Sequence, residues 1–173
     1  MDLVHLHLML NHVPVLGVVF AFVVGVIGFL FKSKAVTRVA LGMLVFAAIV
    51  AVPVYLTGEP AEEVVDGLAG VSEAVIEQHE SAATFSLILA GVTGAFALLA
   101  LLFGRSLTSK LPGYLVAVTL LAALVATASM LWTANLGGQI RHSEIRTAAN
   151  GGTSDAERAP SGQKRESRED DDD

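Results

Sequence analysis

Long apolar runs alternate with short polar connections along the chain. Four runs contain no Asp, Glu, Lys or Arg, and each is close to or above the ~20 residues that an α-helix needs to cross ~30 Å of hydrocarbon. These runs are residues 13–31, 39–57, 81–103 and 111–136. The pattern predicts four transmembrane helices joined by short loops. We therefore expect an all-α fold, an integral membrane four-helix up-and-down bundle.

Several residues mark where these helices begin or break. A single straight helix over residues 1–31 would be ~46 Å long, which exceeds the bilayer. Pro14 therefore predicts a break near the start of the first membrane helix. Pro60 is typical of the first turn of a short helix in the second loop. Ser72 is a plausible N-cap for a third membrane helix that begins outside the lipid.

Small residues recur at every fourth position on two of the predicted helices. Such a stripe lies on one helix face and allows another helix to approach closely in a membrane. The pattern favours a compact bundle, although the same smooth faces would also make room for a flat macrocycle between helices. The residues concerned are Ala82, Ser86, Ala90 and Gly94 in one run and Thr119, Ala123 and Thr127 in the other.

The last part of the chain differs in composition from the bundle. Residues 148–173 are rich in charge and poor in apolar side chains, and they end in a run of Asp. Such a segment cannot bury enough apolar surface to offset its ordering entropy. We expect a transmembrane domain over residues 1–147 and a disordered charged tail over residues 148–173.

Composition narrows the possible functions. Hydrophobic residues make up 53% of the chain, the net charge is -6, and there is no cysteine. The absence of cysteine excludes disulfides, thiolate-bound zinc, cysteine-bound iron–sulfur clusters and covalently attached c-type haem. The acidic balance argues against nucleic acid as a partner. No nucleophile–base pattern or phosphate loop is present, so the sequence leaves open whether the protein is an enzyme.

The distribution of basic residues predicts the orientation in the membrane. The first connection carries three Lys or Arg residues and the third carries two, whereas residues 58–80 carry none and have seven carboxylates. Basic loops stay on the cytoplasmic side. Both termini and the acidic second loop are then expected outside, in a multi-pass protein of the bacterial inner (cytoplasmic) membrane.

All five histidines fall on the predicted outer face. Three precede the first membrane helix, one precedes the third and one follows the fourth; they are His5, His7, His12, His79 and His142. If the segment before Pro14 is helical, His5 and His12 share a face and His7 points elsewhere. His12, His79 and His142 stand at three converging helix ends and are the strongest candidates for cofactor ligands. His5 and His7 are secondary candidates, more typical of interfacial polar residues.

Two charged residues extend this candidate site. Arg141 adjoins His142 and would neutralise an anionic cofactor group. Glu80 adjoins His79 and would orient an imidazole or serve as a metal ligand. The predicted haem-binding set is therefore His12, His79, His142 and Arg141. The predicted set for a transition metal is His12, His79, His142, Glu80, His5 and His7.

Three functional classes fit these observations. The first is electron transfer through haem b, whose iron accepts neutral imidazoles from facing helices. The second is a copper, zinc or iron site, because imidazole serves all three metals. The third is a non-catalytic accessory subunit of a larger redox membrane complex. Haem is preferred because several histidines at one depth, small residues on adjoining helices and an arginine suit an iron porphyrin. A transporter is disfavoured because the membrane runs contain no ionisable relay.

Four motifs carry a resemblance to a known family. They are "HLHLMLNHVPVLG", "PVYLTGEPAEEVV", "GVSEAVIEQHE" and "TANLGGQIRHSEIR". Through them the chain, over about residues 3–146, resembles an uncharacterised bacterial family of small four-helix membrane proteins. That family is similar to small membrane b-type cytochromes. The resemblance implies the four-helix topology more than a function, because no established activity comes with the family.

Overall fold

The computed structural model describes residues 2–66, 68, 70–104 and 112–142. Within these ranges the secondary structure is entirely helical, which confirms the expected all-α fold. The predicted tail at residues 148–173 and the third connection lie outside the described residues. The helices are α1 (Leu3–Leu10), α2 (His12–Leu30), α3 (Lys34–Leu56), α4 (Gly58–Val65), α5 (Glu73–Phe103) and α6 (Gly113–Arg141).

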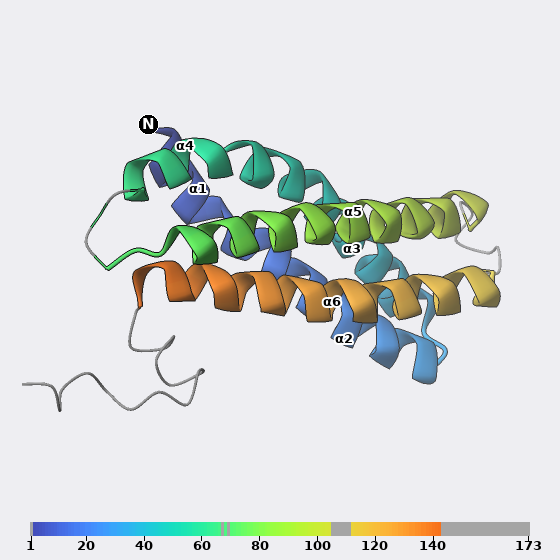
Figure 1. Ribbon diagram of the computed structural model, residues 1–173. Helices are drawn as coiled ribbons and strands as arrows, with labels where there is room; N and C mark the ends of the chain where they lie inside the picture. Colours follow the sequence, from blue (N-terminus) through green and yellow to red (C-terminus); the bar gives the residue numbers. More distant parts are fainter. Residues whose placement is uncertain (1, 67, 69, 105–111, 143–173) are drawn as a thin grey trace, which may run out of the picture.

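Four stretches of the described chain are long and apolar enough to cross a membrane. They correspond to α1 with α2, α3, α5 and α6. In the bundle α2 packs on α3, α3 on α5, α5 on α6, and α6 returns to α2, so the four long helices form a closed ring. Figure 1 shows the long helices lying alongside one another, with α1 and α4 together at one end. This arrangement agrees with the predicted four-helix bundle.

The break predicted near Pro14 is present. Asn11 separates α1 from α2, and Pro14 lies in the first turn of α2. Asn11 keeps helical dihedral angles and its N–H still donates to the carbonyl of His7, so the interruption lasts one residue. Pro14 has no N–H for the carbonyl of Leu10, which explains why regular bonding fails here.

The other predicted boundaries are also found. Pro60 lies in the first turn of the short helix α4, and α5 begins directly after Ser72. The Ser72 side chain makes no capping hydrogen bond; instead its carbonyl accepts from the N–H groups of Val75 and Ile76. The position of the helix start was therefore predicted correctly, although the capping hydrogen bond is missing.

Many small side chains fill the interior beside a few large ones such as Leu41 and Leu44, and most phenylalanines face outward. Ala21, Ala47 and Ala97 are fully buried, whereas Phe20 and Phe46 are exposed. The predicted stripe on α5 is confirmed at Ser86, Ala90 and Gly94, which are all buried. This distribution is expected in a lipid bilayer. There helices associate through close van der Waals packing of small residues, whereas in water the burial of apolar surface drives association.

Gly94 shows how tight this packing is. A Cβ built on Gly94 would lie 2.6 Å from the Cβ of Ala48 on α3, closer than two carbon atoms can approach. At the end of the bundle opposite α1 and α4, the Arg38 guanidinium donates to the carbonyl of Gly104 at 2.8 Å. This bond joins the start of α3 to the end of α5, where the helix dipole favours a cation.

Candidate functional site: two anchored histidines

One end of the bundle gathers the elements that carry the histidines. In Figure 1 α1 and α4 lie at this end, beside the first turns of α5 and the last turns of α6. The end of α3 also reaches it, because α4 follows α3 directly and contacts both α3 and α1. We call α1 and α4 together the cap. Neither helix of the cap buries a residue.

His7 is the histidine of α1 that turns inward. Its Nδ1 lies 3.0 Å from the carbonyl oxygen of Val54 and 3.3 Å from Oγ1 of Thr57, near the end of α3. A carbonyl can only accept, so the Nδ1 of His7 carries the hydrogen. The Thr57 hydroxyl donates to the carbonyl of Pro53 at 2.9 Å and adds a second acceptor for the same N–H. In the neutral ring Nε2 therefore retains its lone pair.

His79 is held in the same way by α6. Its Nδ1 lies 3.0 Å from the carbonyl oxygen of Thr133, so Nδ1 again donates and Nε2 keeps its lone pair. The ring packs on Gly137, where an added Cβ would lie 3.0 Å from Cε1 and 3.3 Å from Nδ1. A glycine at position 137 thus leaves the space that the imidazole occupies.

α1, which carries His7, and the first turns of α5, which carry His79, lie at the same end of the bundle, although the two helices are far apart in sequence. Each ring donates Nδ1–H to a backbone carbonyl, which fixes its orientation and tautomer. Histidines that bind metals usually have an outer hydrogen bond of this kind. The structure therefore provides a pair of oriented imidazoles, each with Nε2 available.

The other predicted site residues lie on the outside of this end. His5 and His12 are exposed on α1 and at the start of α2, and His142 is exposed directly after α6. Arg141 and Glu80 are exposed as well; their positions are the last residue of α6 and the residue after His79. His7, a secondary candidate from the sequence, is thus the histidine that is half-buried and anchored at the same end of the bundle as His79. The helical phase explains this, because His7 points away from the face shared by His5 and His12.

No set of three ligands is found around these residues. Within the part of the chain that the structure describes, no group of three or more His, Asp or Glu side chains is placed to hold a metal ion. The six-residue metal set expected from the sequence is therefore spread over this end of the molecule. The His7–His79 pair is what remains as a candidate binding unit.

Carboxylates of the acidic loop gather between α4 and α5. Burial raises the pKa of Glu62 above 4.5, and the negative charges of Glu80 and Glu59 raise it further. Glu62 lies on α4 and Glu80 in the first turns of α5, so carboxylates of two different helices act on this group. The end of the bundle that carries the cap is therefore rich in carboxylates.

A ladder of hydroxyl groups continues from His79 into the bundle. Thr133, whose carbonyl holds His79, is bonded through its side chain to Ser86 at 2.9 Å. Ser86 is in turn bonded to Ser129, one turn before Thr133 on α6. Sequence reasoning treated Ser86 only as a small packing residue. The signal for the ladder was the four-residue spacing of Ser129 and Thr133, which puts both hydroxyls on one face of the helix.

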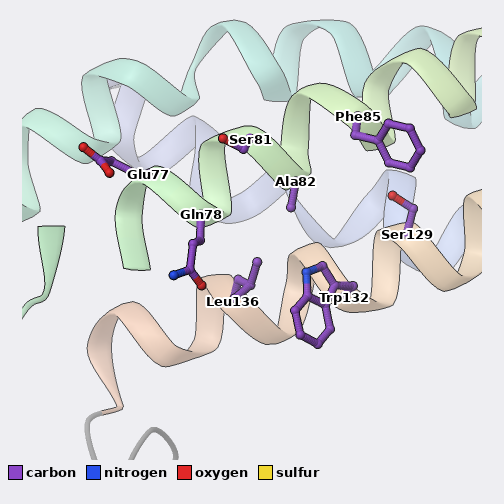
Figure 2. A pocket seen from close by; sticks show the side chains of 8 residues that line it. All are labelled: Glu77, Gln78, Ser81, Ala82, Phe85, Ser129, Trp132 and Leu136. Carbon is purple, nitrogen blue, oxygen red and sulfur yellow. The ribbon is translucent and has the colours of Figure 1, made fainter. Parts of the chain in front are cut away.

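Two hollows lie on the outer surface of the long helices, and neither is lined by a histidine. One, of about 550 Å³, lies between α5 and α6, and the other, of about 270 Å³, lies between α3 and α5. Figure 2 shows the larger one, with side chains from both helices around it. The smaller one is lined only by apolar side chains and glycine.

Resemblance to known proteins adds nothing to this geometry. Comparisons with protein-family models, with curated proteins and with solved structures give no match for the chain. The relation to small membrane b-type cytochromes therefore stays a prediction. What the site can do has to be argued from the His7–His79 pair itself.

Proposed function

We propose that this protein is a multi-pass membrane protein that binds haem b through His7 and His79 and serves electron transfer. The observation that supports this most directly is the anchoring of both imidazoles by backbone carbonyls, at 3.0 Å in each case. Both rings thereby keep the Nε2 lone pair, through which they would hold the haem. His7 replaces His12 and His142 as the preferred partner of His79, because those two residues are exposed.

The number of ligands favours haem over a bare metal ion. A structural zinc ion takes four protein ligands, and a catalytic one takes three. No three-ligand group is present among the described residues. A porphyrin brings four nitrogens of its own, so two imidazoles complete the coordination of its iron. When bound, the haem iron would supply the one-electron chemistry.

A macrocycle has to pass the cap to reach the two histidines. The two hollows lie elsewhere, so a porphyrin has to enter between the cap and the ends of the long helices. Because no residue of α1 or α4 is buried, moving the cap exposes little core. Arg141, the last residue of α6, would neutralise a propionate at the aqueous rim.

The proposed setting follows from the charge pattern and the apolar surface. The protein lies in the bacterial inner membrane with both termini outside, and the haem end faces outward. Lipid covers the long helices, and a larger redox membrane complex would be the electron partner. An accessory subunit without a cofactor and a copper, zinc or iron protein are the alternatives that the experiment below distinguishes.

An optical spectrum of the protein purified in mild detergent tests the proposal. We expect a Soret band and, after reduction, α and β bands typical of haem b. His7→Ala and His79→Ala should each lower haem content per protein by about tenfold or shift the bands, whereas His5→Ala, an exposed histidine on the same helix as His7, should match the parent.

The remaining outcomes separate the alternatives. Bound copper, zinc or iron without haem would replace the proposal with a metal-binding protein. A parent protein without haem or metal would leave the accessory-subunit function. If His12→Ala and His142→Ala lost haem while His7→Ala kept the haem content of the parent, the ligands would be His12 and His142, which the sequence analysis ranked first.

A further inference from the structure

The larger hollow has a mixed lining that the proposed haem site does not use. It has a volume of about 550 Å³ and lies between the outer parts of α5 and α6. Figure 2 shows Phe85 and Ser129 facing one another across the two helices, with Gln78 reaching toward Leu136. The lining residues are Glu77, Gln78, Ser81, Ala82, Phe85, Ser129, Trp132 and Leu136.

The hydrogen bonds among Thr133, Ser86 and Ser129 determine whether the Ser129 hydroxyl donates to a ligand or accepts from it. The Thr133 hydroxyl donates to the carbonyl of Ser129 at 3.0 Å, so its oxygen has to accept from Ser86. The single hydroxyl proton of Ser86 is thus used on Thr133. The contact between Ser86 and Ser129 then requires Ser129 to be the donor. All three protons are directed into the bundle, and Ser129 Oγ presents only lone pairs to the hollow.

The aromatic residues show where a ligand would come from. Trp132 and Phe85 are 61% and 56% exposed, on a surface that meets lipid if α5 and α6 span the membrane. Tryptophan is typical of the membrane–water boundary. Two aromatic side chains beside one hollow suit a planar ring, through stacked or edge-to-face contacts.

The charges of the lining restrict the ligand further. The hollow has no Lys or Arg, and its one ionisable side chain is the carboxylate of Glu77. A phosphate or carboxylate headgroup would find no cation there, which disfavours an anionic lipid. A neutral headgroup that donates hydrogen bonds fits both the Ser129 oxygen and the Glu77 carboxylate.

We propose that this hollow binds a lipid-soluble hydroquinone, with its ring between Phe85 and Trp132 and a hydroxyl donating to Ser129 Oγ. The hydroquinone class combines the three required properties, which are a planar ring, a neutral O–H donor and access from the lipid. The proposal concerns binding alone. It does not depend on haem, because no residue of the hollow belongs to the His7–His79 pair.

Trp132 allows a direct test, because it is the only tryptophan of the chain. A decyl-substituted benzohydroquinone is titrated into the full-length protein in phosphatidylcholine nanodiscs, and quenching of Trp132 fluorescence gives the affinity. The dimethyl ether of the same compound is the matched ligand, since it keeps the ring and loses both O–H donors. We expect the hydroquinone to bind about tenfold more tightly than the ether.

Three variants locate the site. Ser129→Ala should remove the preference for hydroquinone over its ether, because the accepting oxygen is lost while Ser86 stays bonded to Thr133. Ala82→Leu should weaken both ligands by filling the hollow. Ala134→Leu is its control, since Ala134 is exposed on α6 and does not line the hollow. All proteins are compared at equal haem content, because haem also quenches tryptophan.

A second membrane composition distinguishes the hydroquinone from a lipid hydroxyl. In nanodiscs with one third phosphatidylglycerol, whose headgroup carries hydroxyls, the affinity for hydroquinone should be unchanged. Competition by phosphatidylglycerol would overturn the proposal in favour of a lipid headgroup. Equal affinities for hydroquinone and ether in the parent, or unchanged binding in Ala82→Leu, would also overturn it. If the protein lacks haem but still binds hydroquinone, the proposed hydroquinone site is supported and the proposed haem function fails.

Discussion

The position of the His79 ring depends on one residue without a side chain. Gly137 and Gly138 are neighbours near the end of α6, yet only Gly137 has His79 against it. A Cβ at position 138 would meet no atom within 4 Å. The two glycines are thus a matched pair, one with a packing role and one without.

Replacing these glycines should have opposite effects on stability. Gly138→Ala is expected to raise the free energy of unfolding by about 0.5–1 kcal/mol, because alanine favours the helix. Gly137→Ala is expected to lower it by about 1–3 kcal/mol, because the new methyl group pushes the imidazole away from the Thr133 carbonyl. Thermal unfolding in detergent measures both. Equal midpoints for the two variants would contradict the packing of His79 on Gly137.

At the scale of elements, the cap is attached differently from the long helices. The long helices interlock through buried small residues, whereas α1 and α4 bury none. The cap includes polar contacts, such as the hydrogen bond of His7 to Val54, and the carboxyl group of Glu62, which is influenced by Glu80. The attachment of the cap should therefore respond to pH more than the bundle does.

The raised pKa of Glu62 predicts whether stability rises or falls as the pH changes. Burial and the neighbouring carboxylates Glu80 and Glu59 hold its pKa above 4.5. The stability that the neutral side chain contributes is therefore fully present below pH 4.5 and is lost as the pH rises through the folded-state pKa. Glu62→Gln stays neutral throughout, so its advantage in stability over the parent should grow between about pH 4 and pH 7.

The thermal midpoint in detergent, measured across this range, tests the expectation for Glu62. Glu63→Gln is the control, because Glu63 is the exposed neighbour on the same helix. A constant difference between the Glu62→Gln variant and the parent at all pH values would show that the carboxyl group does not ionise in a destabilising environment.

At the scale of the whole molecule, the two ends of the bundle have opposite chemistry. The end with the α2–α3 turn carries Lys32, Lys34 and Arg38, and the end with the cap carries the carboxylates of α4 and the start of α5. Figure 1 places these two groups of elements at opposite ends of the long helices. Such asymmetry predicts a single orientation, with the basic end in the cytoplasm.

Cysteine labelling tests this orientation in a chain that has no cysteine of its own. Ser33→Cys, in the α2–α3 turn, should react with a membrane-impermeant maleimide only after the membrane is permeabilised. Asp66→Cys, directly after α4, should react in intact cells. The reverse pattern would show that the cap and its histidines face the cytoplasm.

The sequence alone predicted the features that depend on local composition and spacing. Uncharged runs of sufficient length predicted four helices long and apolar enough to span a membrane. Pro14 and Pro60 located a break and a helix start, and the stripe ending at Gly94 identified a packing face. These features follow from rules that act within one helix, because backbone groups in lipid have to be satisfied internally and small residues permit close approach.

Only the tertiary structure decided which histidines are paired and what the hydroxyl groups do. His7 bonds to a residue 47 positions away and His79 to one 54 positions away, so their partners depend on the rotation and depth of separate helices. The same holds for Ser86, whose partners Ser129 and Thr133 lie on α6. Periodicity shows which residues share a face of one helix, but it cannot show which carbonyl or hydroxyl of another helix stands opposite, because that depends on how the helices pack.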